Sequence, residues 1–181
     1  MHYLYFVKIK NEEGMTSENA RREAYSQLEN NDFAGEGGYF NNSKADWFVI
    51  GGRWSGELTQ IQLARDFYKE AKELIKPKEN WGISDDEVKQ HEKELQALWK
   101  DMGGKDKHPY NRDNYDTYGA EDDAQIITPE LLKALKKAHG KTNKYGDSVE
   151  VFDPEEQEEY TINQLTKDCI GDWLVVIDYH N

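Results

Sequence analysis

Residues 46–56 read Asp-Trp-Phe-Val-Ile-Gly-Gly-Arg-Trp-Ser-Gly, and this stretch says more about the fold than any other. Its first half carries consecutive apolar residues without polar alternation, which is typical of a strand buried on both faces. Its second half places glycines around Arg53 and Trp54. Glycines after a strand permit positive φ or close backbone approach. The stretch therefore predicts a central strand that runs into a tight turn.

Two further segments are predicted to be strands of the same sheet. Residues 172–176 read Asp-Trp-Leu-Val-Val and repeat the pattern of an Asp-Trp pair followed by three apolar residues. The repeat marks either a duplicated element or two central strands of one sheet. We expect the latter, because buried strands are routinely rich in Val and Ile. Residues 3–10 are also predicted to form a strand. At its start, the side chains on both faces of the strand are apolar, so this end should be buried on both faces.

Helical segments are predicted by apolar stripes and capping residues. Apolar residues at i, i+4 and i+8 predict a helix over residues 17–30, and a Thr-Pro start predicts another over residues 129–139. Two more helices are expected over residues 61–76 and 84–103. A short strand at residues 148–152 completes the set of elements.

This order of elements predicts an α+β domain with a small mixed or antiparallel sheet and helices on one face. We expect a ferredoxin-like core made of about residues 1–57 and 140–181. A helical insertion at about residues 58–139 interrupts it. Residues 1–181 then form a single domain, which suits a length of 181 residues.

Two blocks of the chain carry a resemblance to known proteins. Residues 46–56 resemble a motif of uncharacterised bacterial and phage proteins, and so do residues 175–180, which read Val-Val-Ile-Asp-Tyr-His. The aromatic strand with its Gly-Gly-Arg-Trp turn is also similar to ferredoxin-like domains of plasmid and phage proteins. Their turn usually reads Asn-Trp-Gly-Thr-Lys-Trp, so this chain departs from that pattern. The resemblance implies a small α+β core and a mobile-element origin, and it implies no activity.

Composition and charge exclude several classes of function. Lys and Arg number 23 against 36 Asp and Glu, so the net charge is −13, and the mean hydropathy is −1.00. This charge argues against direct nucleic-acid binding and against contact with an anionic membrane, and no apolar run approaches the ~18 residues of a membrane span. The single cysteine, Cys169, excludes an intramolecular disulfide framework and a cysteine-rich zinc site. We expect a soluble, cytoplasmic protein without a metal or another cofactor.

Gly51, Gly52, Arg53, Trp54 and Ser55 form the candidate ligand-binding segment. Backbone N–H groups of a glycine turn can hold an anion, the Arg53 guanidinium can bind it bidentately, and Trp54 can stack on a base. The alternative is a structural turn or bulge in which Trp54 packs and Arg53 pairs with one of many acids. The segment has neither a Walker sequence nor a dinucleotide fingerprint.

Asp178 and His180 are the candidate catalytic residues, at the end of the last predicted strand. Two positions apart on a strand, they share a face, so Asp178 could orient His180 as a general base, or His180 could bind a metal. The alternative is a terminal histidine that frays with the chain end. Cys169 is interpreted as a buried, inert thiol, because nucleophilic use needs a lowered pKa and a base at hand.

Residues 105–123 are polar, aromatic and irregular, and a loop of this length in a compact domain is usually functional or mobile. Tyrosine is enriched at binding surfaces. The candidate partner-binding set therefore comprises Tyr110, Tyr115, Tyr118, Glu121, Asp122 and Asp123. Residues 114–125 match a calcium loop at some positions, but Gln125 stands where a bidentate Glu is needed, so no calcium site is expected.

Two hypotheses for function follow. The first is an acidic, non-enzymatic interaction protein that binds a basic or DNA-binding protein through the insertion and the tyrosine loop, as an inhibitor or DNA mimic. If the protein is phage-borne, it would inhibit a host defence protein. The second is a small enzyme or binding domain for a nucleotide-like anion, in which Arg53 holds the anion and Trp54 stacks. Asp178 and His180 would then supply acid–base function, and the second hypothesis gains if Arg53 and His180 line one pocket.

Overall fold

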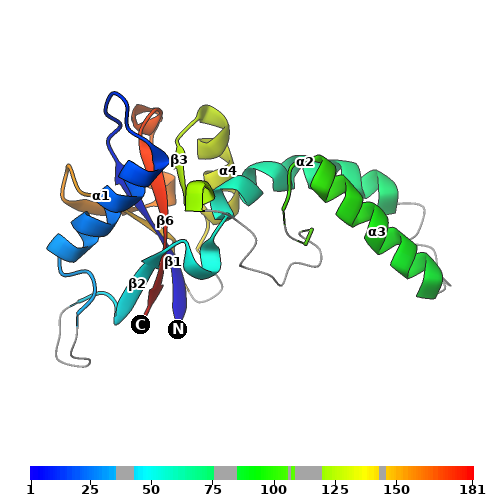
Figure 1. Cartoon of the computed structure of the whole chain (residues 1–181), viewed down its shortest axis with the longest axis horizontal. Helices are drawn as coiled ribbons and strands as arrows, with labels where there is room; N and C mark the ends of the chain where they lie inside the picture. The colour runs from blue at the N-terminus through cyan, green and yellow to red at the C-terminus, as the bar shows by residue number, and fades with distance from the viewer. Residues whose placement is uncertain (36–42, 76–84, 106, 109–119, 143–145) are drawn as a thin grey trace.

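A mixed sheet forms the centre of the fold in a computed structural model, which describes the chain apart from residues 36–42, 76–84, 106, 109–119 and 143–145 (Figure 1). The sheet has six strands in the order β2-β6-β1-β4-β5, with β3 also paired to β6. β1 and β4 run parallel, and the other pairs are antiparallel. The predicted α+β class with a mixed sheet is confirmed. The strands are β1 (His2–Ile9), β2 (Trp47–Ile50), β3 (Ala124–Ile126), β4 (Glu150–Asp153), β5 (Glu158–Thr161) and β6 (Trp173–His180).

β6 is an inner strand of the sheet, flanked by β1 on one side and by β2 and β3 on the other, and it is buried on both faces. Its residues 173–178 are all buried, and it pairs with β1 along its whole length, with His2 opposite His180. On its other side it pairs with β2 and β3, and the Gly51 N–H donates to the Val176 carbonyl at 2.9 Å. The two chain ends therefore lie side by side at one end of the sheet (Figure 1).

Helices cover both faces of the sheet. On one face, the apolar stripe of α1 (Ser17–Asn30) packs against alternate residues of β1 and β6. On the other face, the leucines of α4 (Pro129–His139), together with Leu58, pack against the intervening residues of both strands. The expectation of helices on one face is therefore wrong, because both faces of these two strands are apolar and each needs a cover. The ferredoxin-like arrangement is not confirmed.

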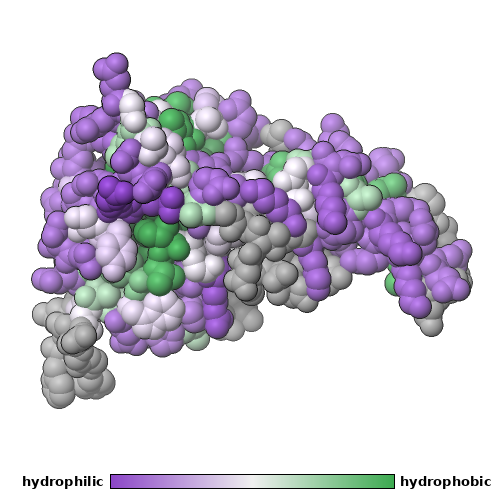
Figure 2. All heavy atoms as spheres, viewed as in Figure 1, coloured by the Kyte–Doolittle hydropathy of each residue, from purple (hydrophilic) through white to green (hydrophobic). Residues whose placement is uncertain are grey.

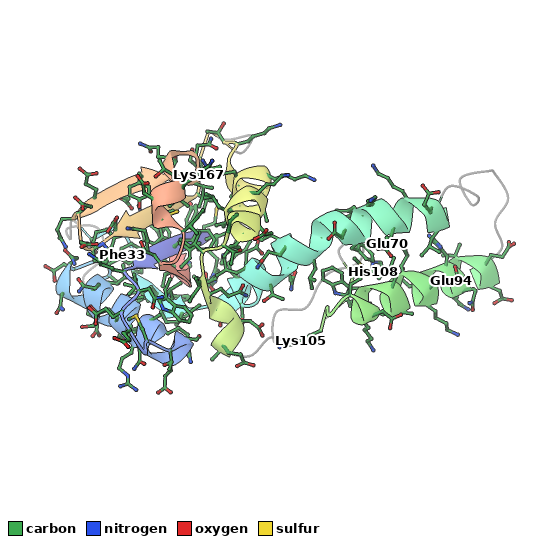
Figure 3. All side chains as sticks on the ribbon, turned by 90° about the horizontal axis from the view of Figure 1, so that it is seen from above. Phe33, Glu70, Glu94, Lys105, His108 and Lys167 are labelled. Atoms are coloured by element: carbon green, nitrogen blue, oxygen red, sulfur yellow. The ribbon has the colours of Figure 1, made fainter. Side chains whose placement is uncertain are left out.

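A pair of helices, α2 (Glu57–Ile75) and α3 (Asp85–Asp101), projects from the core (Figure 1). The pair has a small core of its own, in which the ring centroids of Phe67 and Trp99 lie 5.2 Å apart. His108, which follows α3 in the chain, stacks on Phe67 with ring centroids 5.9 Å apart and so packs against the helix pair (Figure 3). The projecting part is thus stabilised separately from the sheet.

The expected insertion is too long at its C-terminal end. Residues 124–139 belong to the core, because β3 extends the sheet beside β6 and α4 covers one of its faces. The turn signals of residues 103–123 are strong, but they do not mark where the chain returns to the sheet. Only pairing with a distant strand defines that point.

β2 is an edge strand, not the expected central one. Phe48 and Ile50 pack toward α1, whereas Trp47 and Val49 are 40% and 41% exposed. Figure 2 shows the corresponding contrast, a hydrophobic area beside β2 on a mostly hydrophilic face. The two Asp-Trp strands are antiparallel neighbours, so the shared pattern describes one central and one edge strand.

Candidate functional site

The turn after β2 is folded around two carboxylates of the chain itself. Gly51 and Gly52 have φ values of +73° and +54°, which favour glycine. A Cβ on Gly51 would lie 2.2 Å from Oδ2 of Asp123, and a Cβ on Gly52 would lie 2.5 Å from Oδ2 of Asp178. The glycines are needed both for the backbone conformation and for the close approach of these two acids.

Asp178 reaches the turn from the central strand β6 and is 1% exposed. Its Oδ2 accepts the Arg53 N–H at 2.9 Å, and its Oδ1 lies 3.0 Å from Nδ1 of His2. A buried carboxylate is tolerated when hydrogen-bond donors replace the lost water. Asp178 therefore ties the turn to the sheet.

Asp123 reaches the same turn from the short helix η4 (Ala120–Asp123) and is 5% exposed. It accepts the Gly56 N–H at 2.9 Å and the Ser55 hydroxyl at 3.0 Å. Burial raises the pKa of Asp123 above its ordinary value of 3.8, and these two hydrogen bonds oppose the rise. Asp123 thus places its negative charge at the start of α2, where the helix dipole favours an anion.

The predicted ligand-binding segment is therefore already filled. Of its backbone N–H groups, that of Trp54 donates to Gly51 and that of Ser55 to Gly52, at 2.9 and 3.2 Å. Trp54 is half-buried and packs against the core cluster that α4 covers, which favours a packing role for its ring over stacking on a base. The Arg53 side chain is exposed, and within the described residues its guanidinium has no hydrogen-bond or ion-pair partner. The geometry favours the structural alternative for this turn.

Asp178 and His180 share a face of β6, but they do not form the predicted pair. Nδ1 of His180 lies 3.2 Å from Oδ2 of Asp46, and its ring stacks on Trp47 with centroids 5.6 Å apart. The imidazole beside Asp178 belongs to His2, which lies opposite His180 in the register of β1 and β6. Sequence reasoning missed His2, and only the pairing of the first strand with the last could have identified it.

The candidate partner-binding set is only partly described. Tyr110, Tyr115 and Tyr118 lie outside the described residues. Asp122 accepts hydrogen bonds from Thr59 at 3.1 Å and from Lys105 at 2.8 Å, and Asp123 is buried in the turn. Both acids hold the fold locally, which leaves Glu121 as the exposed acid of the set.

Another group of acids lies at the opposite edge of the sheet, on residues 150–159, which we name the acidic hairpin. This segment contains β4, a turn and β5, and it has no Lys or Arg. β5 is an edge strand, paired only with β4 among the described residues. The carboxylates of the acidic hairpin are Glu150, Asp153, Glu155, Glu156, Glu158 and Glu159.

Lysines from outside the hairpin neutralise part of this charge. Lys8 lies 2.8 Å from Asp153 and Lys10 lies 2.7 Å from Glu155. Hydrogen bonding and attraction to Asp153 raise the pKa of Lys8 against the opposing effect of its burial. The carboxylates of Glu156 and Glu158 are exposed and have no partner within the described residues. The hairpin therefore presents uncompensated negative charge.

Cys169 lies beside the acidic hairpin but is not set up as a nucleophile. It is 6% exposed, and its Sγ–H donates to the Thr166 carbonyl at 2.8 Å. Burial raises the pKa of the thiol. It lines a cavity of about 390 Å³ together with Lys8, Asp153 and Tyr160. Lys8 and Asp153 pair with each other there, so neither is a free base for Cys169.

Comparison of the chain with known families, with curated proteins and with solved structures finds no match. In the described part of the chain, no helix has the length and apolar character needed to cross a membrane. The functional conclusion therefore depends on the geometry above.

Proposed function

We propose that this chain is a non-enzymatic interaction protein that binds a basic macromolecular partner through the acidic hairpin. One observation carries the proposal, namely that Glu156, in the turn of the hairpin, and Glu158, at the start of the edge strand β5, have exposed carboxylates without a partner among the described residues. An open edge can accept a strand from a partner through main-chain hydrogen bonds. Complementary charge would steer a basic partner to this edge and speed association.

The internal contacts of the Gly51–Gly56 turn support the interaction role over the nucleotide-like anion role. An external anion would have to displace Asp123 or Asp178, and both are buried and hydrogen-bonded. The Arg53 N–H donates to Asp178, whereas the His180 ring pairs with Asp46. The two residues therefore do not meet at one acid. We extend the proposal to an inhibitor or DNA mimic of mobile-element origin acting in the cytoplasm, supported by the resemblance of residues 46–56 and by the charge of −13.

The proposal is tested by zero-length cross-linking in host lysate with a carbodiimide, which joins carboxylates directly to amines. We expect cross-links at residues 155–159 of this chain, and a captured protein that is basic. The purified partner should then bind the double variant E156Q/E158Q at least tenfold more weakly than wild type, with affinity falling as salt rises.

The matched control is E70Q/D86N, which removes the same charge from exposed acids of the α2–α3 pair, and this pair projects from the core away from the hairpin (Figure 1). Its affinity should equal that of wild type. Retention of no protein at low salt, or cross-links confined to the acids of α3, would contradict the proposal.

A further inference from the structure

The ammonium group of Lys44 is held in a site built from the sheet next to the acidic hairpin. Its Nζ lies 4.7 Å from the ring centroid of Tyr5 and pairs with the carboxylates of Glu150 and Glu159. The Tyr5 hydroxyl donates to Glu159 at 2.6 Å, which fixes ring and carboxylate relative to each other. An aromatic face with two carboxylates is a typical environment for an organic cation.

These groups are positioned by three neighbouring strands. Tyr5 of β1 lies opposite Glu150 of β4, and Phe152 of β4 lies opposite Glu159 of β5. Residues directly opposite one another share a face, so all four side chains lie on the face that α1 covers. The cation site is therefore a rigid part of the sheet and not a chance contact between loops.

A cavity of about 340 Å³ opens at this place. Its walls include the rings of Phe33 and Phe152 together with Leu28, and Glu158 and Glu159 line it on the hairpin side. Phe33 packs against Tyr5 at 5.0 Å and lies at the end of the core away from the α2–α3 pair (Figure 3). Leu28 and the aromatic rings form one side of the cavity, and the rest of its lining is polar or charged, including the carboxylates of Asp32, Glu158 and Glu159. Such a lining suits the apolar stem and the charged end of a lysine side chain.

We propose that this cavity is the binding site for a lysine side chain of the partner, which takes the place of Lys44. The inference rests on the proposed function and names the group that the acidic hairpin recognises. The side chain of Lys44 is 27% exposed and lines the cavity, so the side chain is partly accessible from solvent. Exchange of one ammonium for another keeps the charge of the site unchanged.

Lys44 is well placed to leave the site without disturbing the fold. The neighbouring backbone is fixed, because the Ala45 N–H donates to the Phe33 carbonyl at 3.0 Å. The long lysine side chain can rotate away from the ring and remain solvated. Lys44 therefore competes with the partner's lysine for the site and lowers the affinity of the site for that lysine.

The experiment is a calorimetric titration with the blocked peptide Ac-Gly-Gly-Lys-Gly-Gly-amide, using a norleucine peptide as the uncharged control. We expect K44Q to bind the lysine peptide at least tenfold more tightly than wild type and to ignore the norleucine peptide. Adding E150Q and E159Q to K44Q should abolish binding. K44R keeps the cation in place and should bind as weakly as wild type.

K10Q is the matched control, because Lys10 pairs with Glu155 outside the cavity. It should leave binding of the peptide unchanged. Equal affinity of K44Q and wild type, or retained binding in the triple variant, would overturn the inference. K44M, whose apolar side chain keeps a similar length, repeats the titration if K44Q does not fold.

The outcomes for the cavity and for the proposed function are separable. If the captured partner needs Glu156 and Glu158 but K44Q gains no affinity for the peptide, the lysine site is wrong and the interaction role stands. If no basic protein is captured although K44Q binds the peptide, the cavity is a cation site and the proposed function is wrong.

Discussion

Asp123 and Asp178 lie inside the fold, whereas Glu156, in the turn of the acidic hairpin, and Glu158, at the start of its edge strand β5, lie on the surface. We call the latter two the edge pair, and all four are carboxylates of one strongly acidic chain. The inner pair is 5% and 1% exposed and accepts backbone N–H groups from the turn after β2. The edge pair is exposed and without partners among the described residues. The net charge of −13 therefore comes from two kinds of acid: those whose hydrogen bonds hold the fold, and those that are free to bind a partner.

The difference has a simple physical origin. An ionised carboxylate leaves water at high cost unless donors replace the lost hydrogen bonds, and once they do, its removal exposes those donors in turn. A solvated carboxylate contributes little to stability on its own. Substitutions of the inner pair should therefore change stability, and substitutions of the edge pair should change binding.

The largest loss of stability is expected for Gly52→Ala. The new Cβ would lie 2.5 Å from Asp178 at a φ of +54°, so both backbone strain and displacement of the carboxylate contribute. We expect a loss of about 3 kcal/mol in the free energy of unfolding, measured by urea denaturation.

Gly14→Ala is the control for Gly52→Ala, because Gly14 has a φ of +78° with nothing within 4 Å of a built Cβ. Gly14→Ala should lower the free energy of unfolding by about 1 kcal/mol, through backbone strain alone. Equal losses in the two variants would mean that contact with Asp178 does not matter.

Asp178→Asn should cost about 1–3 kcal/mol in the free energy of unfolding. The amide retains one acceptor oxygen but turns N–H groups toward either the Arg53 N–H or the His2 ring. Asp168→Asn, at an exposed position, should stay within about 0.5 kcal/mol of wild type. Similar stability of the two variants would place Asp178 with the edge acids.

Through Asp123, the free energy of unfolding should change with pH in the direction opposite to that expected for a salt-bridged acid. Its pKa in the folded state lies above the ordinary 3.8, so between these two values the folded state binds more protons than the unfolded one. The contribution of Asp123 to the free energy of unfolding therefore falls as pH rises through this interval.

Urea denaturation of wild type and Asp123→Asn between about pH 3.5 and pH 6.5 measures this contribution as the difference between them. We expect the difference to favour wild type most at the acidic end. Asp168→Asn should show no such trend, and a difference that grows with pH would show that the pKa of Asp123 is lowered by folding.

The smallest effect on stability is expected for E156Q/E158Q. Both side chains are exposed and without partners among the described residues, so the free energy of unfolding should change by no more than about 0.5 kcal/mol. A larger loss would show that the edge acids hold the hairpin, which would remove the contrast with the inner pair.

Local signals in the sequence predict the helices well. Thr128 caps α4 as its Thr-Pro start predicts, and Thr16 caps α1, because a cap depends on residues only a few positions away. The position of β2 at an edge was not predictable from its apolar residues, since edge and centre differ in which strands pair. Apolar content reports burial on average and not the order of strands.

The site was less predictable because its contacts span the whole chain. Asp178 meets His2 across 176 positions, and Asp123 meets Gly56 across 67. The glycines at residues 51 and 52 correctly indicate a turn that approaches an anion closely. The sequence does not show that the anion is supplied by the chain itself.

The most direct test combines thermal unfolding with partner affinity in two variants, Asp178→Asn and E156Q/E158Q. We expect Asp178→Asn to lower the Tm by several degrees while its folded fraction binds the captured partner as wild type does. E156Q/E158Q should keep its Tm and lose at least tenfold in affinity. Wild-type affinity in E156Q/E158Q would contradict the assignment of the acidic hairpin as the binding surface.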